Sequence, residues 1–318
     1  MYPFVGRGEA RLRPGSRGLR LGDHKDRPYA GHRQLQLALR CKTEEEMLNI
    51  KTRYITAALC LAMALGADPT SAATESETEL AKKTQNPVAD LISVPFQNNF
   101  NFGAGSKDEM VWILNVQPVI PIKLNADWNL ITRTIMPIIN QPSLFPHFDN
   151  AVGLGDINPS FFFSPANPGK FIWGAGPTMT FPTATNRILG SGKWSMGPAA
   201  VALFMDGPWV VGALANQQWS FAGWGDKDVN ALLIQPFLNY NLPHGWYLSS
   251  APIITGNFSA SSGNHWTVPV GGGGGKLWRV GKVGLPINTQ VQAFFNAERP
   301  RFGPDWQLRV QIQFLFPK

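Results

Sequence analysis

The chain has 318 residues, of which 44% are hydrophobic and 15% are charged, whereas about a quarter of a typical soluble domain is charged. No run of roughly 18 apolar residues is present, which excludes a membrane-spanning helix. The formal net charge is +7, but from Thr74 onward there are 16 Lys/Arg against 14 Asp/Glu. A protein that binds nucleic acid through overall basicity is therefore excluded, and no nucleic-acid partner is expected.

Residues 1–46 carry ten Lys/Arg, are rich in Gly and Pro, and show no periodicity. We interpret them as a basic disordered leader or as a spurious upstream extension, because Met47 could itself start the chain. Residues 47–73 have the organisation of a secretory signal peptide, with Lys51 and Arg53 before an apolar stretch and small residues before Thr74. The sequence therefore predicts export and cleavage before Thr74.

Residues 74–90 are polar and predict a periplasmic N-terminal segment. This segment could form one or two helical turns, inside the mouth of a larger domain or in the periplasm, or it could be disordered. Both cysteines, Cys41 and Cys60, lie before the predicted cleavage site. The exported chain would then contain neither a disulfide nor a free thiol.

From Leu91 onward, apolar and polar residues alternate with period two, which is typical of strands with two different faces. The pattern predicts twelve strands, and turn residues separate them. Their expected ranges are 91–101, 110–122, 128–140, 152–163, 171–182, 194–204, 209–221, 229–241, 246–258, 266–278, 284–297 and 306–316.

The last strand shows the pattern most clearly. Trp306, Ile312 and Phe316 fall on its apolar face, and Arg309 and Gln311 fall on the opposite face. A terminal amphipathic strand that closes on an aromatic residue is typical of outer-membrane barrels, in which the apolar face meets lipid. We therefore predict an all-β fold over 91–318, a transmembrane antiparallel up-and-down β-barrel of about 12 strands.

The connections and the tryptophans agree with this topology. Turns after even-numbered strands are short, and most loops after odd-numbered strands are longer, as expected for periplasmic turns and extracellular loops. Seven of the eleven tryptophans open a strand, where the two aromatic girdles of a barrel would lie. Proline removes a ladder donor, so each proline inside a strand predicts a local break or bulge. These are Pro118, Pro137, Pro159, Pro177, Pro198, Pro252 and Pro269.

The polar faces of the strands predict the lining of the lumen. Arg133 and Asp156 lie on neighbouring strands within reach of each other, as a structural ion pair or as part of a constriction. The remaining lining residues are mostly amides, which suit small neutral or amphipathic solutes. The full set of expected lumen-lining residues is Asn115, Gln117, Arg133, Asp156, Asn158, Gln235, Asn239, Gln290, Gln292, Arg309, Gln311 and Gln313.

Catalytic and cofactor motifs give little support to an enzyme. The five glycines 271–275 are followed by Lys276 and Leu277, not by the Lys-Ser/Thr of a phosphate loop, so strand curvature or a gap for something inside the barrel is expected. The histidines lie apart, without metal-ligand spacing. We predict no catalytic residue, no metal and no cofactor. The alternative is a lipid hydrolase, since an outer-membrane phospholipase is itself a twelve-stranded barrel, but its His-x-Ser-Asn-Gly motif is absent around His265.

Several segments carry a resemblance to a bacterial family. They are Asn86–Asn99, Gln117–Pro121, Gly153–Asp156, Gly176–Thr178, Gly197–Ala199, Trp266–Gly273 and Phe314–Lys318. The chain over 86–318 resembles proteins described as "MetA-pathway of phenol degradation" proteins or transporters, and sometimes mislabelled neuromedin U. The resemblance implies an outer-membrane barrel with a transport role suggested for aromatic compounds. It brings no catalytic residues.

The sequence thus predicts a porin-like outer-membrane channel for passive passage of small solutes, aromatic or amphipathic compounds among them. Its expected partners are outer-membrane lipid, a small-molecule solute and the barrel-assembly machinery. A structural barrel with a filled lumen is the second alternative, because small barrels often pack their interiors with side chains.

Overall fold

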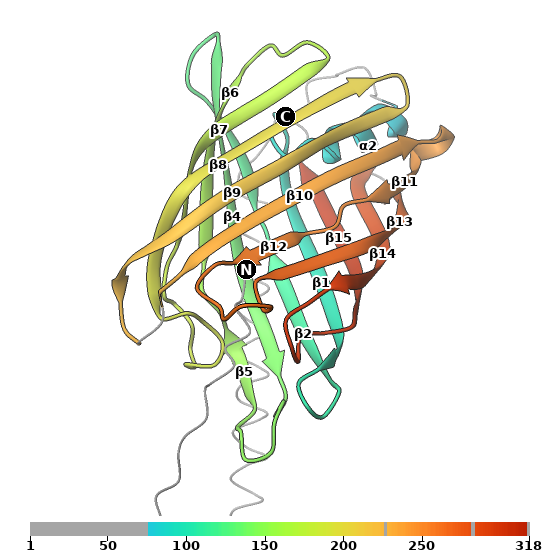
Figure 1. Cartoon of the computed structure of the whole chain (residues 1–318). Coiled ribbons are helices and arrows are strands. Elements are labelled where there is room, and N and C mark those ends of the chain that lie inside the picture. The colour runs from blue at the N-terminus through green and yellow to red at the C-terminus, as the bar shows by residue number, and fades with distance from the viewer. Residues whose placement is uncertain (1–75, 226–227, 281–283, 317–318) are drawn as a thin grey trace, which may run out of the picture. The chain divides into compact units, whose positions relative to one another are not determined.

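The structure, a computed structural model, describes residues 76–225, 228–280 and 284–316. The predicted leader (1–46), the predicted signal peptide (47–73) and the cleavage site before Thr74 lie outside the described residues. The described chain forms one 15-stranded antiparallel sheet that closes on itself as a barrel (Figure 1). A short α-helix precedes the first strand, and a 3-10 turn follows β10.

The bounds of the helices and strands follow in chain order. They are α2 Glu77–Thr84, β1 Ile92–Ala104, β2 Glu109–Val116, β3 Val119–Lys123, β4 Trp128–Gln141, β5 Ala151–Leu154, β6 Asn158–Pro165, β7 Phe171–Thr180, β8 Lys193–Asp206, β9 Trp209–Gly223, β10 Asn230–Asn241, η1 Pro243–Gly245, β11 Trp246–Ser250, β12 Ile254–Asn257, β13 Trp266–Val280, β14 Leu285–Glu298 and β15 Trp306–Phe316.

The fifteen segments occupy twelve positions around the barrel. β2 and β3 both lie between β1 and β4, β5 and β6 both pair with β4, and β11 and β12 both lie between β10 and β13. The barrel is closed by β1, which pairs with β15 over eleven residue pairs from Ile92↔Phe316 to Phe102↔Trp306. The predicted twelve-stranded antiparallel barrel is therefore confirmed. Closure matters physically because it leaves no open sheet edge.

Proline explains some of the strand interruptions. Pro118 separates β2 from β3, Pro252 separates β11 from β12, and a register shift lies between Val268 and Pro269 in β13. Pro159 lies just after the gap between β5 and β6, so a break is present there. The expectation of a break or bulge is wrong for Pro137, Pro177 and Pro198, which stay inside continuous strands. In the last two cases the prolines face each other, since Pro177 and Pro198 are partners across β7 and β8. A missing donor costs a strand one bond, and the neighbouring bonds keep the register.

The outward face of the barrel is apolar and exposed. On β15, Ile312 is 42% exposed, whereas its neighbour Gln313 on the inward face is 6% exposed. Ten of the eleven tryptophans are exposed on the surface and are not packed in a core. All eleven form two rows: Trp128, Trp173, Trp209, Trp246 and Trp278 lie near the short turns, and Trp112, Trp194, Trp219, Trp224, Trp266 and Trp306 lie near the long loops.

The inward face is divided into an apolar half and a polar half. β4 and β6 to β10 carry a buried cluster made of Ile131, Phe162, Ile172, Ala199, Val201, Leu203, Val210, Leu214 and Phe237, together with Val88 from the segment after α2. β1, β14 and β15 instead carry asparagine, glutamine and arginine side chains on this face. The two halves enclose a lumen with one apolar wall and one wall of hydrogen-bonding side chains.

Helix α2 lies in the mouth of the barrel at the end where the turns are short. Its Leu80 and Ala81 are fully buried against Leu91, Tyr247, Leu277 and Leu315. Figure 1 shows the helix at one end of the barrel, beside the turn that follows β10. Of the alternatives for residues 74–90, the structure therefore selects helical turns inside the mouth for the described part.

The sequence of α2 accounts for its start and its docking. Ser76 is the N-cap, whose side chain accepts a hydrogen bond from the backbone N–H of Glu79, and the Ser-x-x-Glu spacing matches a capping box. At the other end, the amides of Gln85 and Asn241 donate to each other at 2.8 and 3.0 Å. None of the described helices has the length and apolarity needed to cross a membrane.

Candidate functional site in the lumen

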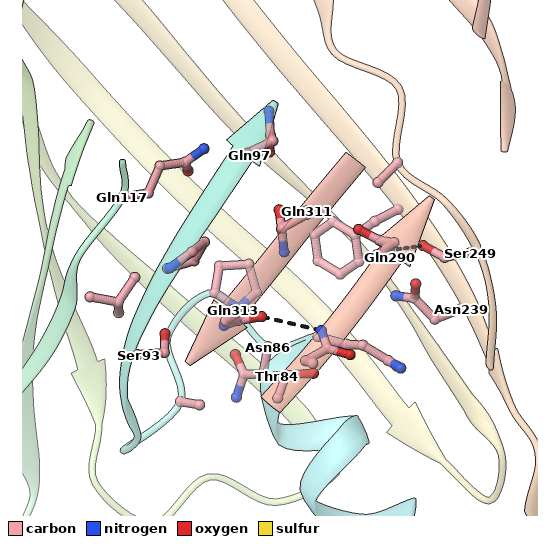
Figure 2. A pocket seen from close by; sticks show the side chains of 18 of the residues that line it. Thr84, Asn86, Ser93, Gln97, Gln117, Asn239, Ser249, Gln290, Gln311 and Gln313 are labelled. Atoms are coloured by element: carbon pink, nitrogen blue, oxygen red, sulfur yellow. Dashed lines mark hydrogen bonds between the residues drawn. The ribbon is translucent and has the colours of Figure 1, made fainter. Parts of the chain in front are cut away.

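A polar cavity lies between α2 and the strands of the polar wall. It holds about 160 Å³ in which the centre of a water molecule can lie, enough for on the order of ten waters. Figure 2 shows Thr84 and Asn86, at and just after the end of α2, on one side of it. It also shows Gln97, Gln311 and Gln313 on strands and Gln117 in the break between β2 and β3. The helix and the segment after it thus form the cavity's floor at the short-turn end.

The amides of the polar wall are arranged in rows across neighbouring strands. The register pairs Gln290 with Gln311, Gln311 with Gln97, and Gln97 with Asn115, so four amides from β14, β15, β1 and β2 form one row. Residues paired across strands share a face of the sheet. The row follows from the alternation within each strand together with the register between strands.

Some of these amides are tied to one another. Gln290 and Gln292 each donate to the hydroxyl of Ser249 at 3.0 Å, and Asn288 donates to Gln313 at 3.2 Å. Within the described part of the chain, the side chains of Gln235, Asn239 and Gln311 form no such bond, and all three line the cavity. These amides remain available to a solute.

The glycine run lies in β13, where it makes room for a tyrosine. Tyr247 is the cross-strand partner of Gly275, and a Cβ at Gly275 would collide with the tyrosine ring. The ring therefore lies across the strand, and its hydroxyl donates to Asn288 on β14 at 2.9 Å. Of the two expectations for the run, a gap for something lodged inside the barrel describes Gly275, and the lodged group is Tyr247.

Arg309 is buried in the polar wall and is held by neutral groups. Its guanidinium donates to the carbonyl of Ala251 at 2.8 Å and, at 3.3 Å each, to the side chains of Asn99, Gln292 and Gln307. It also lies 4.9 Å from the ring centroid of Phe294, a cation–π distance. With 2% exposure, Arg309 is a structural part of the wall.

Arg133 lies on β4, at the border between the two halves of the lumen. It donates to the side chain of Gln117 at 2.6 Å, while a guanidinium has five donors. Arg133 lines the cavity, and among the described residues Gln117 is its one hydrogen-bond acceptor. Among the described residues, neither Arg133 nor Arg309 has a carboxylate within ion-pair distance.

Asp156 serves a different purpose from the one expected. Its carboxylate accepts from the backbone N–H of Ala184 at 3.2 Å, and from the backbone N–H and hydroxyl of Ser191 at 2.6 and 2.9 Å. It thereby fixes the long loop between β7 and β8. The β4–β6 register places Arg133 opposite Ser160 and not opposite Asp156. Arg133 and Asp156 are therefore not the pair that the sequence predicted.

Nine of the twelve expected lumen residues line the cavity. They are Gln117, Arg133, Gln235, Asn239, Gln290, Gln292, Arg309, Gln311 and Gln313. Asn115 lies in the row beside Gln97 but outside the cavity. Asn158 donates to Met179 and Thr180 on β7, so like Asp156 it is engaged in structure away from the cavity.

Sequence reasoning missed five polar residues of the wall: Ser93, Gln97, Asn288, Tyr247 and Ser249. The alternation in β1 and β14 would have placed Gln97 and Asn288 on the inward face. Tyr247 and Ser249 alternate with the exposed Trp246 and Leu248 in β11, so the same alternation would also have placed them on the inward face.

The described histidines lie on separate parts of the barrel. His244 is in the 3-10 turn at the short-turn end, with φ of 60°. His147 has φ of 64° in a long loop, and His265 contacts the backbone carbonyl of Asn257 at 3.0 Å. Among the described residues, no group of three His, Cys, Asp or Glu could hold a metal ion.

Comparison with known proteins finds similarity in structure. No protein-family model matches the chain, and no curated protein matches it. A solved structure, the COG4313 outer membrane channel from Pseudomonas putida F1, superposes with a TM-score of 0.54 at 16% identity, covering 71% of this chain and 94% of that one. OmpF of Salmonella typhi, in complex with daunomycin, reaches a TM-score of 0.32 at 10% identity, covering 71% and 96%. The first similarity supports the barrel fold. The resemblance to the MetA-type family gains no support from the family models.

Proposed function

We propose that the chain is an outer-membrane β-barrel channel for the passive passage of small solutes. The observation that carries the proposal is the contrast between the two faces of one closed sheet, apolar and exposed outside and polar around a cavity inside. Soluble monomers rarely expose apolar patches of this extent. A closed barrel also satisfies its backbone groups within the sheet, as a lipid environment requires.

The two tryptophan rows and the loop lengths support an orientation. Tryptophan collects at the two membrane–water interfaces, and bacterial barrels have short periplasmic turns and longer extracellular loops. On this basis α2 lies at the periplasmic mouth, and the loop fixed by Asp156 lies outside the cell. The named function of the COG4313 structure, an outer membrane channel, is consistent with this assignment.

The two halves of the lumen support passage of solutes with a polar and an apolar part, aromatic compounds among them. Leu214 and Phe237 face the cavity from the apolar half, opposite the amides of the polar half. Such a lining offers hydrogen bonds to one end of a solute and dispersion contacts to the other.

Conductance of the purified, refolded chain in planar lipid bilayers tests the proposal. We expect discrete current steps that decrease when a small aromatic solute is added to one side. Heat-unfolded protein from the same preparation is the control. A folded barrel that inserts without any current would favour the alternative of a structural barrel with a filled lumen, for which the docking of α2 in the mouth is the supporting observation.

The proposal assigns no catalytic role to the chain. His147, His244 and His265 are expected to be dispensable, because they serve loops and turns on separate parts of the barrel. Each His→Ala variant should keep the conductance of the unchanged protein in the same bilayer recordings. Lipid hydrolysis by the pure protein that any of these changes abolished would favour the lipid-hydrolase alternative.

A further inference from the structure

The cavity is lined by basic side chains and, among the described residues, by no acidic ones. Arg133 and Arg309 both line it, and none of the described residues that line it bears a carboxylate. The two guanidinium groups repel each other across this space. Low-dielectric walls strengthen such a field and raise the local concentration of ions of the opposite sign. The cavity is therefore suited to an anion.

The two arginines differ in what they can offer such an anion. Arg309 is engaged by four neutral acceptors and an aromatic ring, so its contribution is charge from within the wall. Arg133 is bound to Gln117 alone among the described residues, which leaves most of its donors free for a ligand. An arginine fork matches the two oxygens of a carboxylate.

Uncommitted amides and an apolar surface complete the site. Gln235, Asn239 and Gln311 line the cavity without side-chain hydrogen bonds among the described residues, so their N–H groups can donate to an oxygen. Val119, Leu214 and Phe237 supply the apolar side, and Leu214 and Phe237 are 3% and 7% exposed. A bare inorganic anion would leave that side unused.

We propose that the cavity binds a small organic anion. Its carboxylate would be held by Arg133 with the neighbouring amides, and its apolar body would lie against Leu214 and Phe237. This proposal rests on the proposed function in so far as the bound anion is the solute that passes. Binding itself does not depend on passage.

Calorimetric titration of the detergent-solubilised, folded protein tests the site with two probes of nearly equal shape. Benzoate carries the carboxylate, and benzyl alcohol is its uncharged counterpart. We expect benzoate to bind at least about tenfold more tightly than benzyl alcohol, because hydrogen bonds to a charged group are stronger than those to a neutral one. Equal affinities, or no binding of benzoate, would overturn the proposal.

Variants locate the binding. Arg133→Gln should weaken benzoate binding by about tenfold or more and leave benzyl alcohol binding unchanged. The matched control Arg187→Gln removes the same charge from an exposed loop position and should change neither affinity. If Arg133→Gln fails to fold, Gln235→Glu keeps the arginine, places a competing carboxylate in the cavity, and should weaken benzoate in the same way. Unchanged benzoate affinity in a folded Arg133→Gln or Gln235→Glu protein would contradict the site.

The result can be separated from the channel proposal. Benzoate binding by a protein that conducts no current would support the site and refute passage. Current without preferential benzoate binding would support the channel and refute the anion site.

Discussion

At the scale of single residues, the lumen shows two ways of keeping an arginine inside a barrel. Arg309 has exchanged water for backbone and amide oxygens, and Arg133 has Gln117 as its one hydrogen-bond acceptor among the described residues. A buried cation is costly unless its donors are satisfied. The two residues should therefore differ when each is shortened, even though both lie on inward faces.

We predict that Arg309→Gln lowers the free energy of unfolding by about 2–3 kcal/mol, because the shorter amide cannot reach Ala251 or cover Phe294. Arg133→Gln should change it by less than about 1 kcal/mol, since one bond is lost and the repulsion of Arg309 is relieved. Reversible unfolding in lipid vesicles measures both. Equal losses would mean that Arg133 is also a structural residue. Arg309 is thus a poor probe of solute passage.

At the scale of elements, α2 lies in the mouth of the barrel and is held there by a few side chains. Leu80 and Ala81 are its buried contacts, and the Gln85–Asn241 pair holds its far end. An eight-residue helix is not stable alone, so its structure depends on docking in the mouth. We therefore expect the packing of α2 in the mouth to affect the passage of solutes through the barrel.

Leu80→Asp is predicted to release α2, because a carboxylate would be buried among apolar side chains without a partner. We expect larger current steps in planar bilayers than for the unchanged protein. Leu80→Met keeps the volume and apolarity and should behave like the unchanged protein. Identical conductance for the aspartate and methionine variants would show that α2 does not limit the path.

The strands make a second prediction at this scale, based on their two faces. Val310 faces outward on β15, and Gln311 faces the cavity beside two arginines. Val310→Glu should cost on the order of 2 kcal/mol in lipid vesicles, because it places a charge against the acyl chains. Gln311→Glu should cost much less, because the cavity supplies water and positive charge. Similar costs for both variants would reject the assignment of faces.

Most of the fold at this scale could be predicted, because strand alternation repeats a local signal. Strands such as β4 and β15 begin or end within a residue of their expected positions. The lining of the cavity was only partly predictable. Alternation assigns Gln311 to a face, but the row that it forms with Gln97 and Gln290 depends on register between distant strands. Asp156 was misjudged because its partners lie in a loop, where no period operates.

At the scale of the whole barrel, the β1–β15 seam is what turns a sheet into an enclosure. Eleven residue pairs join the two strands, and aromatic contacts lie toward both ends of the seam. Phe102 stacks on Trp306 with centroids 4.1 Å apart, and Phe96 meets Phe314 edge-on at 5.9 Å. The seam thus combines a full ladder with outward-facing aromatic packing.

Deletion of residues 306–316 is predicted to abolish the folded barrel, because it leaves β1 and β14 with unpaired backbone groups in lipid. Replacing loop residues 259–264 by a two-residue turn removes chain without removing a strand, and should preserve folding. The measurement is the heat-dependent shift in gel mobility together with protease resistance. A compact, protease-resistant product from the strand deletion would contradict the role of the seam.

The same seam determines the order in which the barrel assembles. Asn99 and Arg309 are hydrogen-bonded across it, yet 210 positions separate them in sequence. The first strand therefore cannot complete its pairing until the last strand is present. Joining distant ends costs entropy that no earlier contact can recover, which makes closure a late and concerted step. Since α2 packs on Leu315 of the last strand, its full docking surface exists only after β15 has joined the barrel. A chain that stops before β15 would therefore form no closed barrel. Whether a molecule becomes functional is decided when its last strand pairs with its first.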